Sequence, residues 1–160
     1  MILSLEVGKL KQLEVLDLEG IDIMDLPNEI MKLTDLTCLK VSLYACMSNG
    51  RRAMQQLVVV SNGRRAMQQS VVVVACGIIS ALSHLDLLMI SVNPDDKQWN
   101  ACVEAMVSEV CTLQSLKTLK FYFPRVELVK QFLLNNPMWV HPSLSNFSFT
   151  IGHHVKHTMS

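Results

Sequence analysis

The residues of this sequence best suited to metal chemistry are histidines near its C-terminal end. His153, His154 and His157 form an H-H-x-x-H run, and His141 lies upstream. The spacing is similar to that of a zinc-binding helix, in which imidazoles one turn apart hold the ion. The run lacks the glutamate that acts as general base in such sites, and terminal segments are usually poorly ordered. We therefore predict a solvated tail there and no metal site.

Nucleophilic and nucleotide chemistry have no better support. The five cysteines are an odd number and no two stand in a C-x-x-C pair, so they indicate neither a disulfide framework nor a zinc ribbon. The sequence contains no G-x-x-x-x-G-K-[ST] loop, no G-x-G-x-x-G turn and no G-x-S-x-G elbow. We predict no catalytic residue, no cofactor and no enzyme activity. Reduced cysteines, and an N-terminus without the features of a secretory signal, favour a cytoplasmic protein.

One spacing of aliphatic residues recurs along the chain and is expected to organise the fold. The pattern L-x-x-L-x-x-L-x-L runs from Leu10 to Leu18 and returns, with valine as its last residue, from Leu33 to Val41. All four apolar positions shift by 23 residues, which lies within the roughly 20–29-residue period of leucine-rich repeats. Further copies run from Leu82 to Ile90 and from Leu113 to Phe121, and a looser copy runs from Leu144 to Phe149.

The same leucines could instead line one face of an amphipathic helix, because they stand three residues apart. Two features favour strands: the last step of each copy alternates with period two, and Pro27 interrupts any long helix between the first two copies. We predict an α/β fold, with residues 1–160 forming a single leucine-rich-repeat domain. It is a solenoid arc of about five irregular repeats, with a short parallel sheet on its concave face and helices and loops on its convex face.

Two convex helices can be placed from the sequence. Asn93 and Pro94, followed by two aspartates, make a good helix start. The inward face of this first helix is expected to consist of Trp99, Cys102, Val103, Met106, Val107 and Val110. The second helix is expected from about Val126 to Leu133, with Val129, Phe132 and Leu133 turned inward and an Asn-Asn-Pro sequence at 135–137 ending it. Trp99 and Trp139 are expected to be packing residues.

Residues 48–60 are repeated at once as residues 61–73, with twelve of 13 positions identical. We interpret the second copy as a tandem duplication that forms a surface loop, since lengthening a loop costs little entropy. Four arginines and no acid in residues 48–70 leave open a basic loop that binds an acidic partner. The apolar run from Val71 to Leu82 is shorter than the roughly 20 residues of a membrane span, so we predict that it is core.

Residues between the leucines of each strand are expected to point outward over the concave sheet, because side chains alternate along a strand. Asp17 and Lys40, on neighbouring strands, could form an ion pair, although such a pair contributes little at a surface. The three outward rows, each in chain order, are Val15, Cys38, Leu87, Thr118 and Asn146; Asp17, Lys40, Met89, Lys120 and Ser148; and Glu19, Ser42, Ser91, Tyr122 and Thr150.

An apolar patch is expected near the third and fourth units, formed by Leu87, Met89, Tyr122 and Phe123. Exposed apolar groups with polar neighbours are typical of partner sites, although these groups could instead pack beneath residues 48–81. A net charge of zero gives no reason to expect a nucleic-acid partner. The candidate protein-binding concave face consists of Asp17, Glu19, Lys40, Ser42, Leu87, Met89, Ser91, Thr118, Lys120, Tyr122, Asn146 and Ser148.

The run from Leu26 to Leu39 resembles the L-P-x-E-I-x-x-L-x-x-L-x-x-L sequence common in leucine-rich repeats of plant intracellular immune receptors. Residues 92–101, 116–124 and 139–147 are similar to C-terminal repeats of the coiled-coil, nucleotide-binding group of these disease-resistance proteins. The resemblance implies a sensor that contacts a pathogen effector or a guarded host protein. It also implies a contact with the nucleotide-binding domain of the intact receptor that holds the resting state. No nucleotide-binding residue can be carried over to this sequence.

Two alternatives remain open at the level of sequence. Leucine-rich repeats also form the substrate-recognition arms of ubiquitin ligases, although no F-box-like segment precedes the repeats here. The near-perfect duplication, and a first strand without a polar cap, are also compatible with a truncated or degenerate receptor fragment that has no function of its own.

Overall fold

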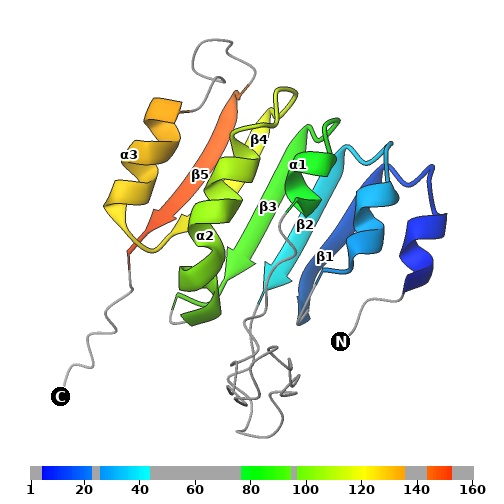
Figure 1. Cartoon of the computed structure of the whole chain (residues 1–160), viewed down its shortest axis with the longest axis horizontal. Helices are drawn as coiled ribbons and strands as arrows, with labels where there is room; N and C mark the ends of the chain where they lie inside the picture. Colours follow the sequence, from blue (N-terminus) through cyan, green and yellow to red (C-terminus); the bar gives the residue numbers. More distant parts are fainter. Residues whose placement is uncertain (1–4, 23–25, 44–76, 95–96, 136–143, 153–160) are drawn as a thin grey trace, which may run out of the picture.

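The structure is a computed structural model of the whole chain, and it describes residues 5–22, 26–43, 77–94, 97–135 and 144–152. Short helical segments alternate with strands throughout this part (Figure 1). In chain order the elements are the 3-10 helix η1 (Leu5–Lys9), β1 (Val15–Asp22), the 3-10 helix η2 (Asn28–Lys32), β2 (Cys38–Leu43), α1 (Ile78–Ala81), β3 (Leu87–Val92), α2 (Lys97–Val110), β4 (Thr118–Phe123), α3 (Val126–Asn135) and β5 (Asn146–Ile151).

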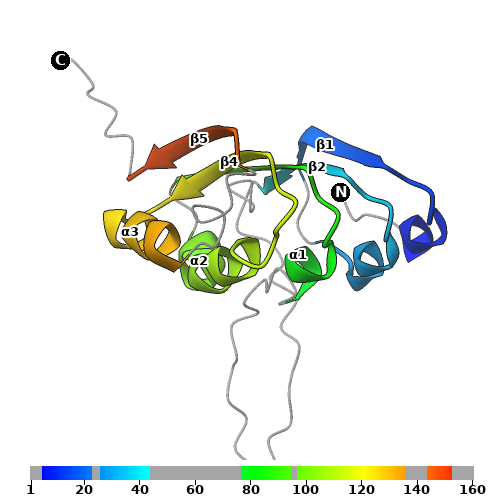
Figure 2. The ribbon, with the colours of Figure 1, turned by 90° about the horizontal axis from the view of Figure 1, so that it is seen from above.

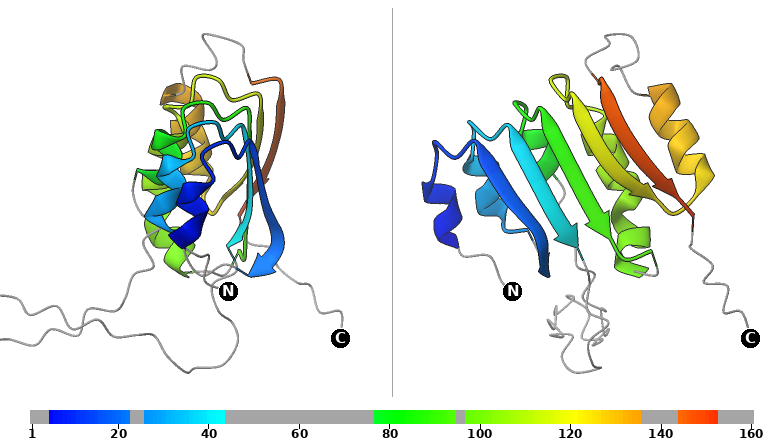
Figure 3. Two further views of the ribbon diagram at one scale, coloured as in Figure 1. Left: turned by 90° about the vertical axis from the view of Figure 1, so that its right-hand side faces the viewer. Right: turned by 180° about the vertical axis from the view of Figure 1, so that it is seen from behind.

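The strands form one sheet in the order β1-β2-β3-β4-β5, and every neighbouring pair is parallel. Each helical segment returns the chain to the start of the next strand, as parallel pairing requires. All the helical segments lie on one face of the sheet (Figures 2 and 3). No described element covers the opposite face, which we call the open face. The predicted α/β repeat architecture is therefore confirmed for the described residues.

The spacing of three between leucines reflects a turn that recurs before β1, β2 and β3. The amide N–H of Leu33 donates to the carbonyl of Ile30 (3.0 Å), and that of Leu36 donates to the carbonyl of Leu33 (3.2 Å). The same two bonds recur between Ile79 and Leu85. Each such turn brings residues three apart onto one side of the chain. Helix-like spacing therefore buries these leucines without a continuous helix.

Leucines of the three central copies are almost fully buried, which follows from stacking between neighbouring units. No member of this group is more than 2% exposed: Leu33, Leu36, Leu39, Val41, Leu82, Leu85, Leu88, Ile90, Leu113, Leu116, Leu119 and Phe121. The outer copies differ, since Leu10 is 55% exposed and Phe147 is 56% exposed. Burial in this fold therefore depends on having a neighbouring unit on both sides.

A second recurring feature aligns the strands, and we call it the carbonyl ladder. At each of the four junctions, the carbonyl of the residue before one strand accepts hydrogen bonds from two consecutive amides at the start of the next strand, at 2.7–3.0 Å. These bonds run from Thr37 and Cys38 to Glu14, from Asp86 and Leu87 to Thr37, from Lys117 and Thr118 to Asp86, and from Ser145 and Asn146 to Lys117. Because the same pair of bonds opens every junction, the strands begin in one register.

The two predicted convex helices are present as α2 and α3. The predicted inward face of α2 is confirmed, since Trp99, Val103 and Val110 are buried and Cys102 is half-buried. In α3, Val129 and Phe132 are buried as predicted, and the helix ends at Asn135. The prediction for Leu133 is wrong, because this side chain is 42% exposed and Leu128 is buried in its place. The buried stripe of α3 is centred near Phe132, which leaves Leu133 at its margin.

Several predictions concern residues outside the described part of the chain. They include the duplicated segment at 48–73, the histidine run at 153–157, His141 and Trp139. Of the apolar run that begins at Val71, the described part contributes Ile78, Ile79 and Leu82 to the core. None of the helices in the described ranges is long and apolar enough to cross a membrane.

Candidate protein-binding face

Two of the three predicted outward rows cross the sheet as expected. The register pairs Val15 with Cys38, and the same row continues through Leu87, Thr118 and Asn146. The middle row is aligned in the same way through Asp17, Lys40, Met89, Lys120 and Ser148. The repeat spacing therefore locates correctly the residues that lie side by side across five strands.

The third row fails at β1, where the register shifts. Leu18 pairs with Val41, but the next pair joins Asp22 to Ser42, so Glu19 does not lie opposite Ser42 as predicted. Gly20 sits in this irregular stretch with a φ of 77°, a left-handed conformation that glycine adopts without steric cost. Its amide N–H donates to the Ser42 hydroxyl at 3.0 Å. Ser42 is only 2% exposed, so its assignment to a binding surface is wrong: it holds the β1 bulge.

Phe123 of the predicted apolar patch is fully buried, and Tyr122 is also misplaced in the predicted face, because it is only 4% exposed. Its hydroxyl donates to the carbonyl of Gly152 (3.1 Å) and lies 3.5 Å from the carbonyl of Pro94. Its own carbonyl accepts a hydrogen bond from the indole N–H of Trp99 (3.2 Å). Tyr122 thus ties β4 to α2 and to the segments that follow β3 and β5, and its role is structural.

The remaining candidate residues are accessible to different degrees. Asp17, Glu19, Asn146 and Ser148 are exposed. The half-buried members are Lys40, Leu87, Met89, Ser91, Thr118 and Lys120. The candidate residues omit Val15, which is 54% exposed at the edge of the same face. Val15 belongs to the first predicted outward row, so its position in the strand was enough to predict that it lies on this face.

Charged side chains on the open face pair with one another across strands. The ammonium of Lys40 lies 2.8 Å from Oδ2 of Asp17, which confirms the predicted ion pair. The hydrogen bond from Lys40 lowers the pKa of the Asp17 carboxyl, helped by the backbone N–H of Glu19 at 3.0 Å from Oδ1. The same hydrogen bond raises the pKa of Lys40. Both groups therefore stay charged over a wide pH range.

A longer contact crosses the whole centre of this face. Lys120 on β4 lies 3.9 Å from the carboxylate of Glu19 on β1. These strands are three positions apart in the sheet, which corresponds to about 14 Å between backbones. The pair therefore reaches over the row that contains Lys40 and Met89. Both side chains are more than 40% exposed, so a competing charge has access to them.

Cys38 is the thiol of the first outward row. It is half-buried and unbonded to another cysteine, and desolvation raises the pKa of its thiol. A thiol with a raised pKa carries little thiolate at neutral pH and is a poor nucleophile. Cys38 is therefore a half-buried, weakly nucleophilic side chain of the open face.

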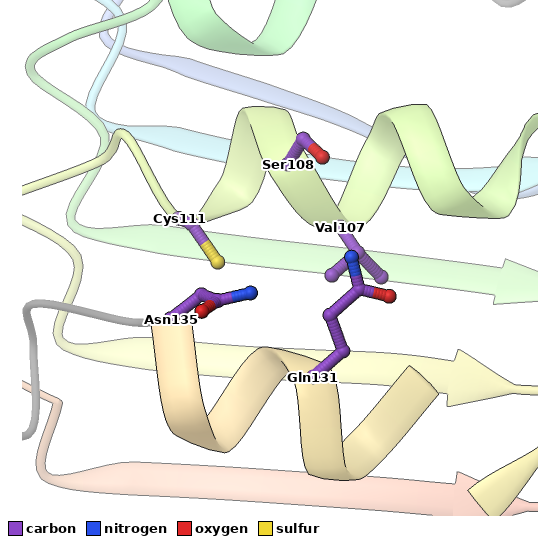
Figure 4. A pocket seen from close by; sticks show the side chains of 5 residues that line it. All are labelled: Val107, Ser108, Cys111, Gln131 and Asn135. Atoms are coloured by element: carbon purple, nitrogen blue, oxygen red, sulfur yellow. The ribbon is translucent and has the colours of Figure 1, made fainter. Parts of the chain in front are cut away.

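A small pocket on the helix layer is a weaker candidate for a binding site (Figure 4). It lies between α2 and α3, has a volume of about 200 Å³, and is lined by Val107, Ser108, Cys111, Gln131 and Asn135. Ligand pockets usually measure about 300–1,000 Å³. Burial raises the pKa of the Cys111 thiol, which keeps it protonated. Within the described ranges, no three His, Cys, Asp or Glu side chains are placed to hold a metal ion.

The recurring leucine units, the carbonyl ladder and the open sheet face define a class of protein: α/β repeat proteins whose strands present a row of side chains to a partner. The sequence model of the leucine-rich repeat region family matches residues 2–159, and the chain belongs to this family. Leucine-rich repeat regions are generally non-catalytic protein-interaction modules. Comparison with curated proteins finds no match, and comparison with solved structures finds none.

Proposed function

We propose that this chain is the sensor module of a plant intracellular immune receptor of the coiled-coil, nucleotide-binding class. In this role residues 1–160 form one solenoid arc in the cytoplasm, and the open face is its concave, partner-binding side. The partner is a pathogen effector or a guarded host protein. The observation that carries the proposal is the open face itself, on which two outward rows run in register across all five strands.

The motif behind the resemblance to immune receptors has a structural role in this fold. Pro27 precedes η2, and Ile30, Leu33, Leu36 and Leu39 are all fully buried. These residues set the shape of the unit and cannot touch a partner. Recognition therefore falls to the residues between the leucines, which can change without disturbing the core. A receptor family that follows changing ligands needs this separation.

The centre of the open face has the composition of a protein-binding surface. Leu87 and Met89 are half-buried and apolar, and charged groups from β1, β2 and β4 surround them. A partner side chain placed on them would be desolvated at the centre of the contact, where binding energy concentrates. The surrounding ion pairs would contribute more to orientation and association rate than to affinity.

Signalling in this proposal depends on competition for one surface. The nucleotide-binding domain of the intact receptor contacts the repeats in the resting state, and the effector or host partner displaces it. A ligand can shift such an equilibrium only by the difference between its affinities for the two states. Overlap of the two contacts on the open face supplies that difference.

The test uses two methionines that differ in location. Met89 lies on the open face, and Met31 is 39% exposed on η2 in the helix layer. The chain is co-expressed in leaf tissue with the coiled-coil and nucleotide-binding part of a receptor of this class. We expect the two to co-purify and the cell-death response to fall. Met89→Glu should abolish both effects, and the matched control Met31→Glu should retain them.

Two results would count against the proposal. The first is the absence of co-purification when the wild-type chain is folded and present in excess. The second is equal loss in the Met89 and Met31 variants, because the open face would then have no special part in binding. Circular dichroism of both variants separates loss of binding from loss of folding.

A further inference from the structure

One ion pair spans most of the open face. The ammonium of Lys120 on β4 lies 3.9 Å from the carboxylate of Glu19 on β1, and β2 and β3 separate these two strands. Neighbouring strands lie about 4.8 Å apart, so the two side chains must lean toward each other across β2 and β3 to meet. Met89 on β3 pairs with Lys120 in the register, and it therefore lies along this path. The pair thus crosses the apolar centre of the open face.

This contact is loose compared with the other ion pair on the same face. Lys40 lies 2.8 Å from Asp17 and donates a hydrogen bond to it. The separation of 3.9 Å between Lys120 and Glu19 is longer than the roughly 2.7–3.2 Å of such a bond. The side chains of Lys120 and Glu19 are 44% and 47% exposed, and exposed ion pairs contribute little. A carboxylate that approaches Lys120 more closely can therefore displace Glu19.

The surroundings of the pair indicate which of its two charges is exchanged. The pKa of Lys40 is raised mainly by its hydrogen bond to Asp17, and the charge of Glu19 adds to this effect. A Glu19 carboxylate that leaves Lys120 thus still faces a second lysine. Lys120 makes no other ion pair with the described residues. Exchange of the carboxylate keeps all four charges compensated, whereas exchange of the lysine leaves Lys120 without a counter-charge.

The outward rows carry different charges at β1 and at β4. Ser148 follows Lys120 in the middle row, and Thr118 and Asn146 lie on the same two strands in the first row. A partner carboxylate placed over β4 therefore meets one lysine among uncharged side chains. Placed over β1, the same carboxylate would meet the acids of that strand, of which Asp17 is exposed. The charge pattern of the open face thus directs an acidic group to β4.

We propose, on the basis of the proposed function, that the protein bound by the open face presents a carboxylate beside an apolar side chain. The carboxylate displaces Glu19 and binds the ammonium of Lys120. The apolar side chain lies on Leu87 and Met89, on the strand next to Lys120. In the free chain the Glu19 carboxylate occupies the place of the partner's acid. A partner with a lysine at this point is repelled by Lys120, so the pair discriminates between partners.

The test neutralises each member of the pair in turn. Glu19→Gln removes the internal competitor, so the chain should bind the coiled-coil and nucleotide-binding part of the receptor about two- to fivefold more tightly. Lys120→Gln removes the group that receives the acid and should weaken binding by a similar factor, whereas Lys120→Arg retains the charge and should bind like the wild-type chain. The matched control is Glu104→Gln, which neutralises an exposed ion pair with Arg125 (2.7 Å) on the helix layer and should change nothing. Binding is measured as the amount that co-purifies at increasing amounts of the chain.

The signs of these changes separate the alternatives. If Glu19→Gln weakens binding and Lys120→Gln strengthens it, the partner presents a cation and the proposal is wrong. If both variants bind like Glu104→Gln, the pair lies outside the contact. The proposal then fails, while the proposed function still stands on the comparison of Met89→Glu with Met31→Glu. If the wild-type chain does not co-purify at all, both fail together.

A second measurement needs no partner. Hydrogen peroxide oxidises accessible methionine to the sulfoxide, and mass spectrometry of proteolytic fragments follows each methionine separately. Because the pair crosses Met89, Glu19→Gln should raise the oxidation rate of Met89 by about two- to fivefold and leave that of Met31 on η2 unchanged. An unchanged rate at Met89 would mean that the pair does not cover this residue in solution, and the proposal would lose its basis. Circular dichroism shows whether each variant is folded.

Discussion

Glu109 should be the polar residue on which the third repeat unit most depends. Its carboxylate, on α2, accepts hydrogen bonds from the backbone amides of Gly77 (2.6 Å), Ile79 (3.0 Å) and Ser80 (3.2 Å). These amides open α1, a helix of four residues that has no side-chain cap of its own. Through this contact α2 holds the segment that leads into β3. Replacing Glu109 with alanine should therefore loosen the start of that unit.

The magnitude follows from the three bonds. A single hydrogen bond to a charged group contributes about 1.5–3 kcal/mol, and loss of a helix N-cap costs about 0.5–2 kcal/mol. The three bonds share one carboxylate, and Glu109 is half-buried, so water can replace part of what is lost. We expect Glu109→Ala to lower the free energy of unfolding by about 2 kcal/mol. At about 2–4 °C per kcal/mol for a domain of this size, Tm should fall by about 4–8 °C.

The assay is urea unfolding followed by circular dichroism, with the slope m compared between proteins so that only changes in stability are counted. Glu104→Ala is the matched control. Glu104 lies on the same helix but is exposed, and its ion pair with Arg125 (2.7 Å) is a surface pair that contributes at most about 1 kcal/mol. If the free energies of unfolding of the two alanine variants differ by less than about 0.5 kcal/mol, the hydrogen bonds from α1 to Glu109 stabilise the protein no more than a surface ion pair does, and the reasoning is refuted.

Three further predictions concern single contacts. The pKa of the Asp17 carboxyl is lowered in the folded state, so its contribution to stability is present above the unfolded pKa and is lost as pH falls through the folded value. In Lys40→Gln, a ¹³C NMR titration should show the pKa of Asp17 rising toward its ordinary value. An unchanged titration would exclude the ion pair with Lys40 as the cause of the shift. Trp99→Phe removes the indole N–H that donates to the buried carbonyl of Tyr122, and it should lower the free energy of unfolding by about 1–3 kcal/mol in thermal unfolding. Trp99→His retains a ring N–H and should lose less of this free energy than Trp99→Phe. Gly20→Ala places a side chain on a residue with a φ of 77° and should lower the free energy of unfolding by about 1–2 kcal/mol. The new methyl group has open space around it, so the loss comes from the backbone conformation alone. A neutral result would mean that the β1 bulge relaxes at no cost.

Much of the fold could be predicted because one spacing controls it. In the first three units each turn of three residues brings the next leucine of the pattern into position, and the strand begins two residues after the second turn. Counting from the leucines is therefore enough to align the first two outward rows, including the ion pair between Asp17 and Lys40. The count fails where β1 contains an irregularity after Leu18. A glycine inside a strand pattern is a recognised signal for a bulge, and Gly20 was such a signal.

Other features depend on contacts that no local pattern contains. Alternation along β4 indicates which face Tyr122 occupies. The carbonyls that its hydroxyl contacts, however, belong to residues 28 and 30 positions away in the sequence. Likewise, nothing near Glu109 in the sequence identifies the three amides that it binds, because they lie about thirty residues earlier. Burial of polar groups depends on tertiary neighbours, whereas the apolar period depends only on the unit itself.

The two misplaced residues, Ser42 and Tyr122, together narrow the part of the candidate face that is accessible. Ser42 and Tyr122 both lie near the ends of their strands and are buried. The hydroxyl of each forms a hydrogen bond with a backbone group outside its own strand. The exposed or half-buried candidates belong mostly to the first two rows, toward the strand starts. Substitutions at such surface positions usually change stability by about 0.5 kcal/mol or less. Substitutions at the strand starts should therefore leave the fold intact, whereas substitutions near the strand ends also weaken it, so the binding surface in our proposal falls on the first two rows.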